Sequence, residues 1–303
     1  MSTSKLSLGP VFFNWPVEKW RDFYFRMADE APIDSVYLGE VVCSKRAPFY
    51  EPVLPEVIDR LQAAGKEVIH STLALIMTGR EMESVRNLTE DDSLMVEAND
   101  ISAVACLKGR PHMIGPFLSV YNEGTLNYLA GLGATRFCLP VEVARDTMRT
   151  LAGDVEAELE VIVFGRLPLA ISARCYHARS HQLHKDNCQY VCAADPDGME
   201  LETLEDQPFL AVNGTQTLSY TCCNLIGELG GLDEMGIKRF RLQPQDTDMV
   251  EVAQIFRHVA DGKMEAPAAE SKLFGLMDGM PFSDGFFHGR EGVSYAGDEA
   301  YVA

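Results

Sequence analysis

Residues 34–75 read DSVYLGEVVCSKRAPFYEPVLPEVIDRLQAAGKEVIHSTLAL, and this stretch decides the fold. Residues 34–40 have the apolar side chains of a buried strand. In residues 52–64, which follow, the apolar positions have the spacing of an amphipathic helix. Gly65 closes that helix, and residues 66–75 form a second apolar strand. A strand, a helix and a strand in this order predict a parallel βαβ unit.

The same alternation runs along most of the chain. Further strands are expected at 6–13, 94–98, 112–117, 136–140, 158–165 and 238–242, and further helices at 18–29, 79–88, 101–108, 122–132, 142–151, 224–235 and 247–259. Eight strands in such units predict an α/β fold, a TIM-like (β/α)8 barrel that is complete or distorted. An open, doubly wound parallel sheet is the alternative. We expect one barrel-like domain over 1–262, interrupted by a cysteine-bearing insertion at about 166–223 after the seventh strand, and an irregular C-terminal tail over 263–303.

Composition limits the classes of function. The chain has 303 residues, is 47% hydrophobic and carries a formal net charge of -19. Such an acidic surface repels phosphate backbones and anionic lipid, so nucleic acid is not an expected partner. The N-terminus lacks the apolar core of a signal peptide, and no apolar run is long enough for a transmembrane segment. We therefore expect a cytoplasmic protein whose eight cysteines are reduced thiols.

Three of those thiols cluster in residues 174–192, which read RCYHARSHQLHKDNCQYVC. Cys175, Cys188 and Cys192 lie among polar residues, where thiolates commonly hold a metal or a redox centre. A tetrathiolate site needs a fourth ligand, and Cys43 is the best candidate. Zinc and iron–sulfur clusters both accept four thiolates, and spacing alone leaves both open. The histidines of this segment are a weaker set of candidate ligands: His177, His181 and His184.

The barrel prediction places other polar residues beside these cysteines. Cys43 follows the second expected strand and Cys175 the seventh, so both belong to the face where barrel active sites lie. Candidate substrate-binding residues at strand ends on this face are His70, Glu97, Tyr121, Asn122, Glu142 and Gln243. Arg174 could bind an anionic substrate or offset thiolate charge. Glu97 and Glu142 could act as acid or base, or could be structural ion-pair partners.

Familiar hydrolase and nucleotide motifs are missing. The sequence contains no HExxH, no GxSxG and no Walker loop, so no serine or zinc protease mechanism is indicated. No single residue stands out as catalytic.

Several segments together resemble the bacterial collagenase-like peptidase family, and within it the UbiU/UbiV branch of ubiquinone biosynthesis. They are LGPVFFNWP, YLGEVVCSKR, STLAL, CLPVEVARD, GRLPLAISARCYHARS, DNCQYVC and VNGTQTLS, and they span residues 6 to about 245. The resemblance implies a barrel and a 4Fe-4S cluster, whose four ligands correspond to Cys43, Cys175, Cys188 and Cys192.

The same resemblance implies a function and a partner. Proteins of this branch work as a heterodimer with a homologous UbiU-type subunit in oxygen-independent hydroxylation of the ubiquinone ring, with prephenate implicated as the oxygen source. Proteolysis is not expected. Two rival interpretations are a non-catalytic subunit, whose cluster is structural or transfers electrons, and a zinc-stabilised peptidase.

Overall fold

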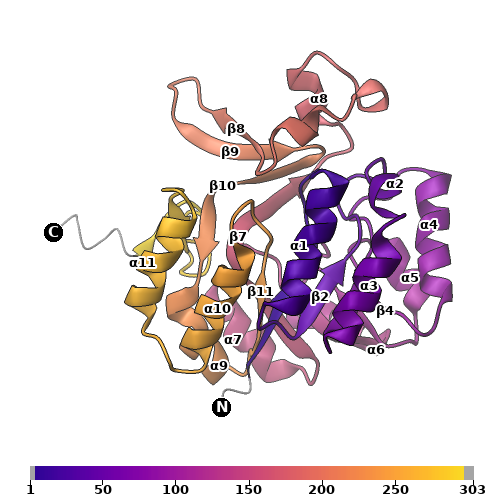
Figure 1. Cartoon of the computed structure of the whole chain (residues 1–303). Coiled ribbons are helices and arrows are strands. Elements are labelled where there is room, and N and C mark those ends of the chain that lie inside the picture. Colours follow the sequence, from indigo (N-terminus) through magenta and orange to yellow (C-terminus); the bar gives the residue numbers. More distant parts are fainter. Residues whose placement is uncertain (1–3, 297–303) are drawn as a thin grey trace.

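The computed structural model describes residues 4–296, and its centre is a closed barrel of eight parallel strands (Figure 1). The barrel strands, in the order in which they pair, are β1 (Lys5–Leu8), β2 (Ser35–Leu38), β3 (Glu67–Ser71), β4 (Met95–Ala98), β5 (His112–Ile114), β6 (Ala134–Cys138), β7 (Glu158–Ile171) and β11 (Arg239–Leu242). The predicted (β/α)8 barrel is therefore confirmed.

Strand β11 closes the barrel. On one side it pairs in parallel with β1, where Lys5 lies opposite Arg239, and on the other with β7, where Arg239 lies opposite Glu160. Because both edges of the sheet are joined by this one strand, the open doubly wound alternative is wrong.

Helices surround the barrel and cover its apolar outer face (Figure 1). Thr78 and Glu81 form a reciprocal capping box at the start of α4, and the side chains of Asp100 and Asn122 cap α5 and α6. The surrounding helices are α1 (Val17–Asp29), α2 (Ala47–Tyr50), α3 (Leu54–Ala63), α4 (Gly79–Glu90), α5 (Ile101–Leu107), α6 (Glu123–Gly131), α7 (Arg145–Asp154), α9 (Leu229–Glu234), α10 (Met249–Ala260) and α11 (Ala266–Leu276).

The hydrophobic core lies between the strands and the helices, and little of it lies inside the barrel. The large core cluster includes Val36, Leu38, Val96 and Phe137 on the strands, together with the buried faces of the helices. A separate small cluster contains only Tyr37, Ile69 and Met113, with Met95 packed against it. The barrel interior is otherwise polar.

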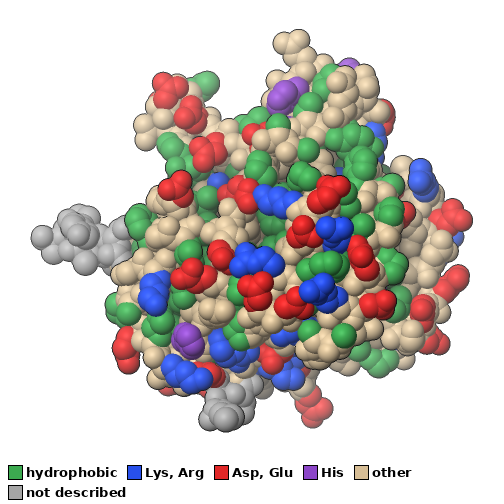
Figure 2. All heavy atoms as spheres, viewed as in Figure 1, with side chains coloured by type: hydrophobic (Ala, Val, Ile, Leu, Met, Phe, Trp, Pro, Cys, Tyr) green, Lys and Arg blue, Asp and Glu red, His purple; other side chains and the backbone are tan. Residues whose placement is uncertain are grey.

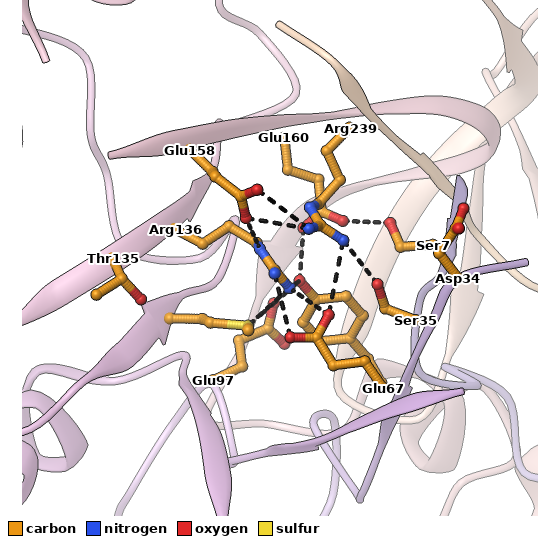
Figure 3. A network of polar contacts seen from close by, with 12 residues as sticks. Ser7, Asp34, Ser35, Glu67, Glu97, Thr135, Arg136, Glu158, Glu160 and Arg239 are labelled. Atoms are coloured by element: carbon orange, nitrogen blue, oxygen red, sulfur yellow. Dashed lines mark hydrogen bonds and ion pairs between the residues drawn. The ribbon is translucent and has the colours of Figure 1, made fainter. Parts of the chain in front are cut away.

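That interior holds a network of charged side chains (Figure 3). Arg241 is 1% exposed and lies 2.7 Å from Glu97 and 2.5 Å from Glu160, while its guanidinium stacks 3.8 Å from the centre of the Tyr37 ring. Burial opposes ionisation of Glu160, yet Arg241 and Arg136 hold the pKa of this carboxyl below its usual range. Each buried charge therefore depends on its partner.

Further ion pairs continue the network along the barrel. Arg136 pairs with Glu158 at 2.8 Å and with Glu67 at 3.2 Å. Arg239 pairs with the same Glu158 at 3.1 Å and donates a hydrogen bond to Ser35 at 2.7 Å. The Arg136–Glu67 pair crosses the interior from β6 to β3, whereas the contacts to Glu158 join β6 and β11 to their neighbour β7 (Figure 3).

The insertion begins as a continuation of β7. This strand has 14 residues, and its second half leaves the barrel at Gly165, whose φ is +109°. A side chain at Gly165 would meet the backbone oxygen of Gln243 at 2.7 Å, so both the conformation and the space require glycine. Outside the barrel β7 pairs antiparallel with β10 (Gln216–Asn224), which is followed in the sheet by β9 (Pro208–Asn213) and β8 (Met199–Glu202).

The cysteine segment belongs to this projecting sheet. Figure 1 shows β8, β9 and the short helix α8 (Tyr176–Ser180) standing above the barrel, beside α2. Two short 3-10 turns follow α8, at Lys185–Asn187 and Val191–Ala194. The predicted insertion at 166–223 therefore forms a sheet and a loop over one end of the barrel.

The C-terminal tail was expected to be irregular, but it contains regular secondary structure within residues 263–296. Residues Ala266–Leu276 form α11, which packs on α10, and Phe282–Ser283 form a short strand, β12, beside β10. The side chains of Phe282 and Phe287 are 7% and 3% exposed. The aromatic residues of the tail therefore drive it onto the barrel because their burial removes apolar surface from water.

The surface carries both signs of charge. Figure 2 shows acidic and basic side chains interspersed over the face that contains α1, α3 and α10, so the net charge of -19 is not gathered there into one patch. Within residues 4–296, no helix is both long enough and apolar enough to cross a bilayer.

The buried network predicts a large effect of removing its central cation. Arg241→Met should lower the free energy of unfolding by about 3–5 kcal/mol, because Glu97 and Glu160 stay buried after losing the cation that both contact. Urea denaturation followed by circular dichroism measures the change. Arg149→Met is the matched control, since Arg149 pairs with Asp146 on the surface, and it should cost about 1 kcal/mol or less. Equal losses in the two variants would contradict the assigned role.

Candidate metal centre

Cys43 lies in a tight turn after β2. Its backbone N–H and that of Val42 both donate to one carboxylate oxygen of Glu40, each at 2.9 Å. Gly39 has a φ of +129° and packs against the backbone oxygen of Ser71, where a side chain would approach to 2.5 Å. The turn after β2 is therefore held by its own hydrogen bonds and by β3, and it fixes where the Cys43 thiol lies.

Cys175 begins the short helix α8. Its sulfur accepts a hydrogen bond from the backbone N–H of Ala178 at 3.3 Å, as an N-cap residue does, and its S–H donates to the backbone oxygen of Gly214 at 3.2 Å. Strand β7 positions this residue, because β7 ends at Ile171 only four positions earlier.

Cys188 and Cys192 are placed by an unusual turn between them. Gln189 and Tyr190 have φ values of +48° and +55°, so two successive residues with side chains adopt the left-handed conformation. That conformation costs roughly 1–2 kcal/mol per residue outside glycine. Surrounding contacts hold it: the Tyr190 ring packs edge-on against Phe49 at 4.8 Å between ring centres.

All four thiols line a single cavity. Cys43, Cys175, Cys188 and Cys192 surround a space of about 340 Å³, counting the space at its opening. Its lining also includes three cationic side chains, Lys45, Arg46 and Lys185. Two segments that are far apart in the sequence, 43–46 and 175–192, thus contribute the thiols and the cations of one site. The charge around it suits a group of thiolates.

Arg46 ties this site to the barrel. It is 1% exposed and donates to the backbone oxygen of Phe12 at 2.9 Å and to the side-chain oxygen of Asn213 at 2.7 Å. Asn213 in turn donates to the backbone oxygen of Cys192 at 3.0 Å. The Arg46 Nε makes no hydrogen bond with the described residues, although it is buried. A buried guanidinium with an unused donor is suited to an anionic group in the adjoining cavity.

Other contacts affect the hydrogen bonding and the pKa of the cysteine thiols. Asn14 donates from Nδ2 to the Cys192 sulfur at 3.4 Å. Burial raises the pKa of the Cys43 and Cys175 thiols above their usual range, and the nearby Arg46 opposes that rise. A metal centre that bound these residues would displace their protons, because thiolates are the binding form.

The thiols share a cavity but do not converge on one point. Among residues 4–296, no three His, Cys, Asp or Glu side chains are close enough together to hold a single metal ion. Mononuclear zinc needs its sulfur ligands about 2.3 Å from one centre. A multinuclear iron–sulfur cluster binds one thiolate per iron and occupies the space between the sulfurs.

The candidate substrate-binding residues are not brought together. Only His70 lines a cavity next to the cysteines. Glu97 and Gln243 are buried, Glu97 in the ion network of the barrel interior and Gln243 by donating to the backbone oxygen of Pro10 at 2.5 Å. Their strand-end positions in the sequence did not reveal that both point inward.

The remaining candidates lie on the surface. Tyr121 donates a hydrogen bond to Glu142, which together with burial raises the pKa of Tyr121 to about 12. Asn122 caps α6 by accepting from the Thr125 N–H at 2.9 Å. Arg174 is exposed and does not line the cysteine cavity. The cations beside the thiols are instead Lys45, Arg46 and Lys185, none of which was a sequence candidate. The closeness of the first two to Cys43 in the segment CSKR is the signal that could have identified them.

His177 has a structural role in this loop. It is fully buried, its Nε2 lies 2.9 Å from Asp195, and its Nδ1 lies 3.2 Å from the backbone oxygen of Val212. Its ring stacks on that of His181. None of the three loop histidines lines the cysteine cavity. They are therefore poor candidates for ligands, whereas the four cysteines remain the predicted set.

Comparison with family models identifies the chain's relatives. The model of peptidase family U32 matches residues 20–296, which is nearly the whole chain. The chain belongs to peptidase family U32. This finding bears out the collagenase-like peptidase resemblance at the level of the family.

The U32 match includes every element that builds the cysteine cavity. Cys43, Arg46 and the segment from Cys175 to Gly214 all fall inside the matched residues. The other four cysteines also fall inside them but lie elsewhere in the fold: Cys106 on α5, Cys138 on β6, and Cys222 and Cys223 on β10. Family membership therefore does not by itself separate the two sets of thiols, whereas the cavity does.

The assignment of ligands predicts the iron content of cysteine variants. Changing Cys43, Cys175, Cys188 or Cys192 to Ala should remove most of the bound iron, because the cluster then loses one of its anchors. Cys138→Ala is the matched control, since that thiol is buried inside the barrel; it should keep the iron and cost about 1 kcal/mol of stability. Iron analysis of anaerobically purified protein measures both. Iron lost from Cys138→Ala but kept by Cys43→Ala would contradict the ligand set.

Proposed function

We propose that this U32 protein is of the UbiV type: an iron–sulfur protein that acts with a homologous UbiU-type subunit in oxygen-independent hydroxylation of a ubiquinone precursor. The observation that carries the proposal is the cavity shared by Cys43, Cys175, Cys188 and Cys192. The sequence resemblance to the UbiU/UbiV branch supplies the reaction, and the cavity supplies a place for the cofactor.

The charges around the cavity support a cluster rather than free thiols. Four thiolates together carry more negative charge than a buried site tolerates without counter-charges. Lys45, Arg46 and Lys185 provide three positive charges on the cavity wall. An inert core cysteine needs no such surroundings, and Cys223 illustrates this: burial raises its pKa well above the ordinary thiol value, and the nearby Cys222 and Asp284 raise it further.

In this proposal the protein holds the cluster and controls its electrostatic environment. A four-iron cluster at this site would supply one-electron transfer. Arg46 anchors the Cys192 turn to the barrel through Asn213 and faces the thiols with a permanent positive charge. Asn14 stabilises the Cys192 sulfur by donating a hydrogen bond to it. Glu40 holds the Cys43 turn by accepting two backbone N–H groups.

A second candidate function is a non-catalytic subunit, whose cluster is structural or passes electrons to the partner. One observation favours it: the titratable side chains on the cavity wall are thiols, cations and the phenol of Tyr190, with no carboxylate or histidine among them. Acid–base groups would then come from the partner or from the neighbouring cavity that contains His70. A zinc-stabilised peptidase has less support, because the cavity wall holds neither a histidine nor a carboxylate, the groups that most often activate water in hydrolysis.

The identity of the cofactor has a direct test. Anaerobically purified protein should be brown, contain about four irons per chain and lose its visible absorbance in air, since clusters held near the surface oxidise readily. Absorption spectra and metal analysis of the same sample make the measurement. Colourless protein with stoichiometric zinc would instead support the peptidase alternative.

The partner has a separate test. Co-expression with the UbiU-type homologue from the same genome should give a one-to-one complex in size-exclusion chromatography, and only the complex should hydroxylate the quinone precursor. A stable chain that ignores this homologue and hydroxylates the precursor alone would overturn the heterodimer. Hydroxylation that survives changes to His70 but not to Cys43 would favour the non-catalytic alternative.

A further inference from the structure

A second, much larger cavity lies beside the cysteine cavity. It spans about 1770 Å³ including its open mouth, and lies where β2 and β3 end, between α3 and α4. Apolar side chains from four different elements line it: Trp20 of α1, Leu38 of β2, Leu54 of α3, and Val85 and Leu88 of α4. Polar side chains line it as well, and a concave site that combines apolar surface with placed polar groups is typical of small-molecule binding.

Two cations of this cavity also line the cysteine cavity. Lys45 and Lys185 belong to both linings, so they mark the junction between the two. The Lys185 ammonium has no carboxylate partner among the described residues, and it donates to the Met77 sulfur at 3.9 Å. The Lys45 ammonium donates to the backbone oxygen of Lys185 and lies 3.9 Å from Asp186, whose side chain is fully exposed. Because an ammonium has three donors, both cations keep donors for an anion.

The acidic side chains of the cavity wall are already engaged or lie in solvent. Glu81 accepts hydrogen bonds from Ser44, at 2.6 Å, and from the backbone of Met77 and Thr78. Glu40 accepts from the two backbone groups of the Cys43 turn. Glu51 and Asp186 are exposed. The unused positive charge at the junction is thus not cancelled by a free buried carboxylate.

His70 adds an uncharged polar group to the same wall. Burial lowers the pKa of this imidazole, so it is neutral at pH 7, and its ring makes no hydrogen bond with the described residues. A neutral imidazole can donate to or accept from a ligand. The cavity therefore combines apolar surface, a neutral imidazole, serine and threonine hydroxyls, and two cations at its junction with the cysteine site. A further cation, Arg80, lines it from α4 and is exposed.

We propose that this cavity binds an apolar ligand with an anionic oxygen head group, its body between α3 and α4 and its head at Lys45 and Lys185. The head then lies at the boundary with the cysteine cavity. That this ligand is the substrate of the reaction rests on the proposed function, whereas its chemical class rests on the cavity alone.

Binding of 8-anilino-1-naphthalenesulfonate, an apolar aromatic anion, to the anaerobically purified full chain tests the site by fluorescence titration. Ser84→Phe should weaken binding about tenfold or more, because Ser84 lines the cavity from α4 and a phenyl ring there would compete with the ligand for space. Asn87→Phe is the matched control: the residue is exposed on the same helix outside the cavity, and affinity should stay within about twofold.

The charge of the head group is tested with a neutral analogue. Lys185→Gln should weaken the sulfonate probe about tenfold, as expected for loss of a charge-assisted bond, and leave N-phenyl-1-naphthylamine unchanged. Displacement by oleate and by 4-hydroxybenzoate distinguishes the two sources of such a ligand, a lipid acid and an aromatic acid. If either acid displaces the sulfonate probe, the ligand site is supported. If neither acid displaces it, the proposed site is overturned.

Iron content is measured on the same samples, so that the two proposals can fail separately. Iron-free protein that still shows the Ser84→Phe and Lys185→Gln effects would sink the cluster and leave the ligand site. Protein that retains its iron, but in which Ser84→Phe binds the probe as the wild type does, would overturn the ligand site alone. Equal loss of the charged and neutral probes in Lys185→Gln would overturn the anionic head group.

Discussion

The ion pairs of Arg241 with Glu97 and Glu160 occupy the middle of the barrel, and the arrangement of its strands depends on them. Buried charges are costly unless each has its partner, so strands β4, β7 and β11 are held in one arrangement. These charged side chains occupy the barrel interior. Both cavities beside the cysteines lie instead outside the strands, at the ends of β2 and β3 and under the insertion.

The contact between the barrel and the insertion depends on Arg46. This side chain lies between the Phe12 backbone, Asn213 of β9 and the cysteine cavity, so it joins the N-terminal part of the barrel to the projecting sheet. Gly214 packs so closely on the guanidinium that a side chain there would approach it to 2.3 Å. The cysteine loop then forms a wall of the large cavity through Lys185 and Tyr190. Cofactor site and ligand site thus share structural supports.

Features that depend on a local sequence pattern were predicted correctly, whereas the burial of individual polar side chains was not. Alternating strands and helices predicted the barrel, and the polar surroundings of Cys175, Cys188 and Cys192 predicted a common site. Glu97 and Gln243 also stand at strand ends, but their side chains point into the barrel and bond there. The helix Ala266–Leu276 was missed because its apolar residues show little helical periodicity and its Gly and Pro neighbours suggested a loop.

The sequence by itself determined the βαβ repeat, the family and the four candidate thiols, because hydrophobic periodicity and residue type act through neighbours along the chain. Only the tertiary structure decided that Cys43 meets a segment more than a hundred residues away, and that Lys45, Arg46 and Lys185 surround them. It also decided which carboxylates are free and which are paired. These are contacts between distant segments, and they arise when parallel strands close a barrel and bring their carboxyl ends to one face.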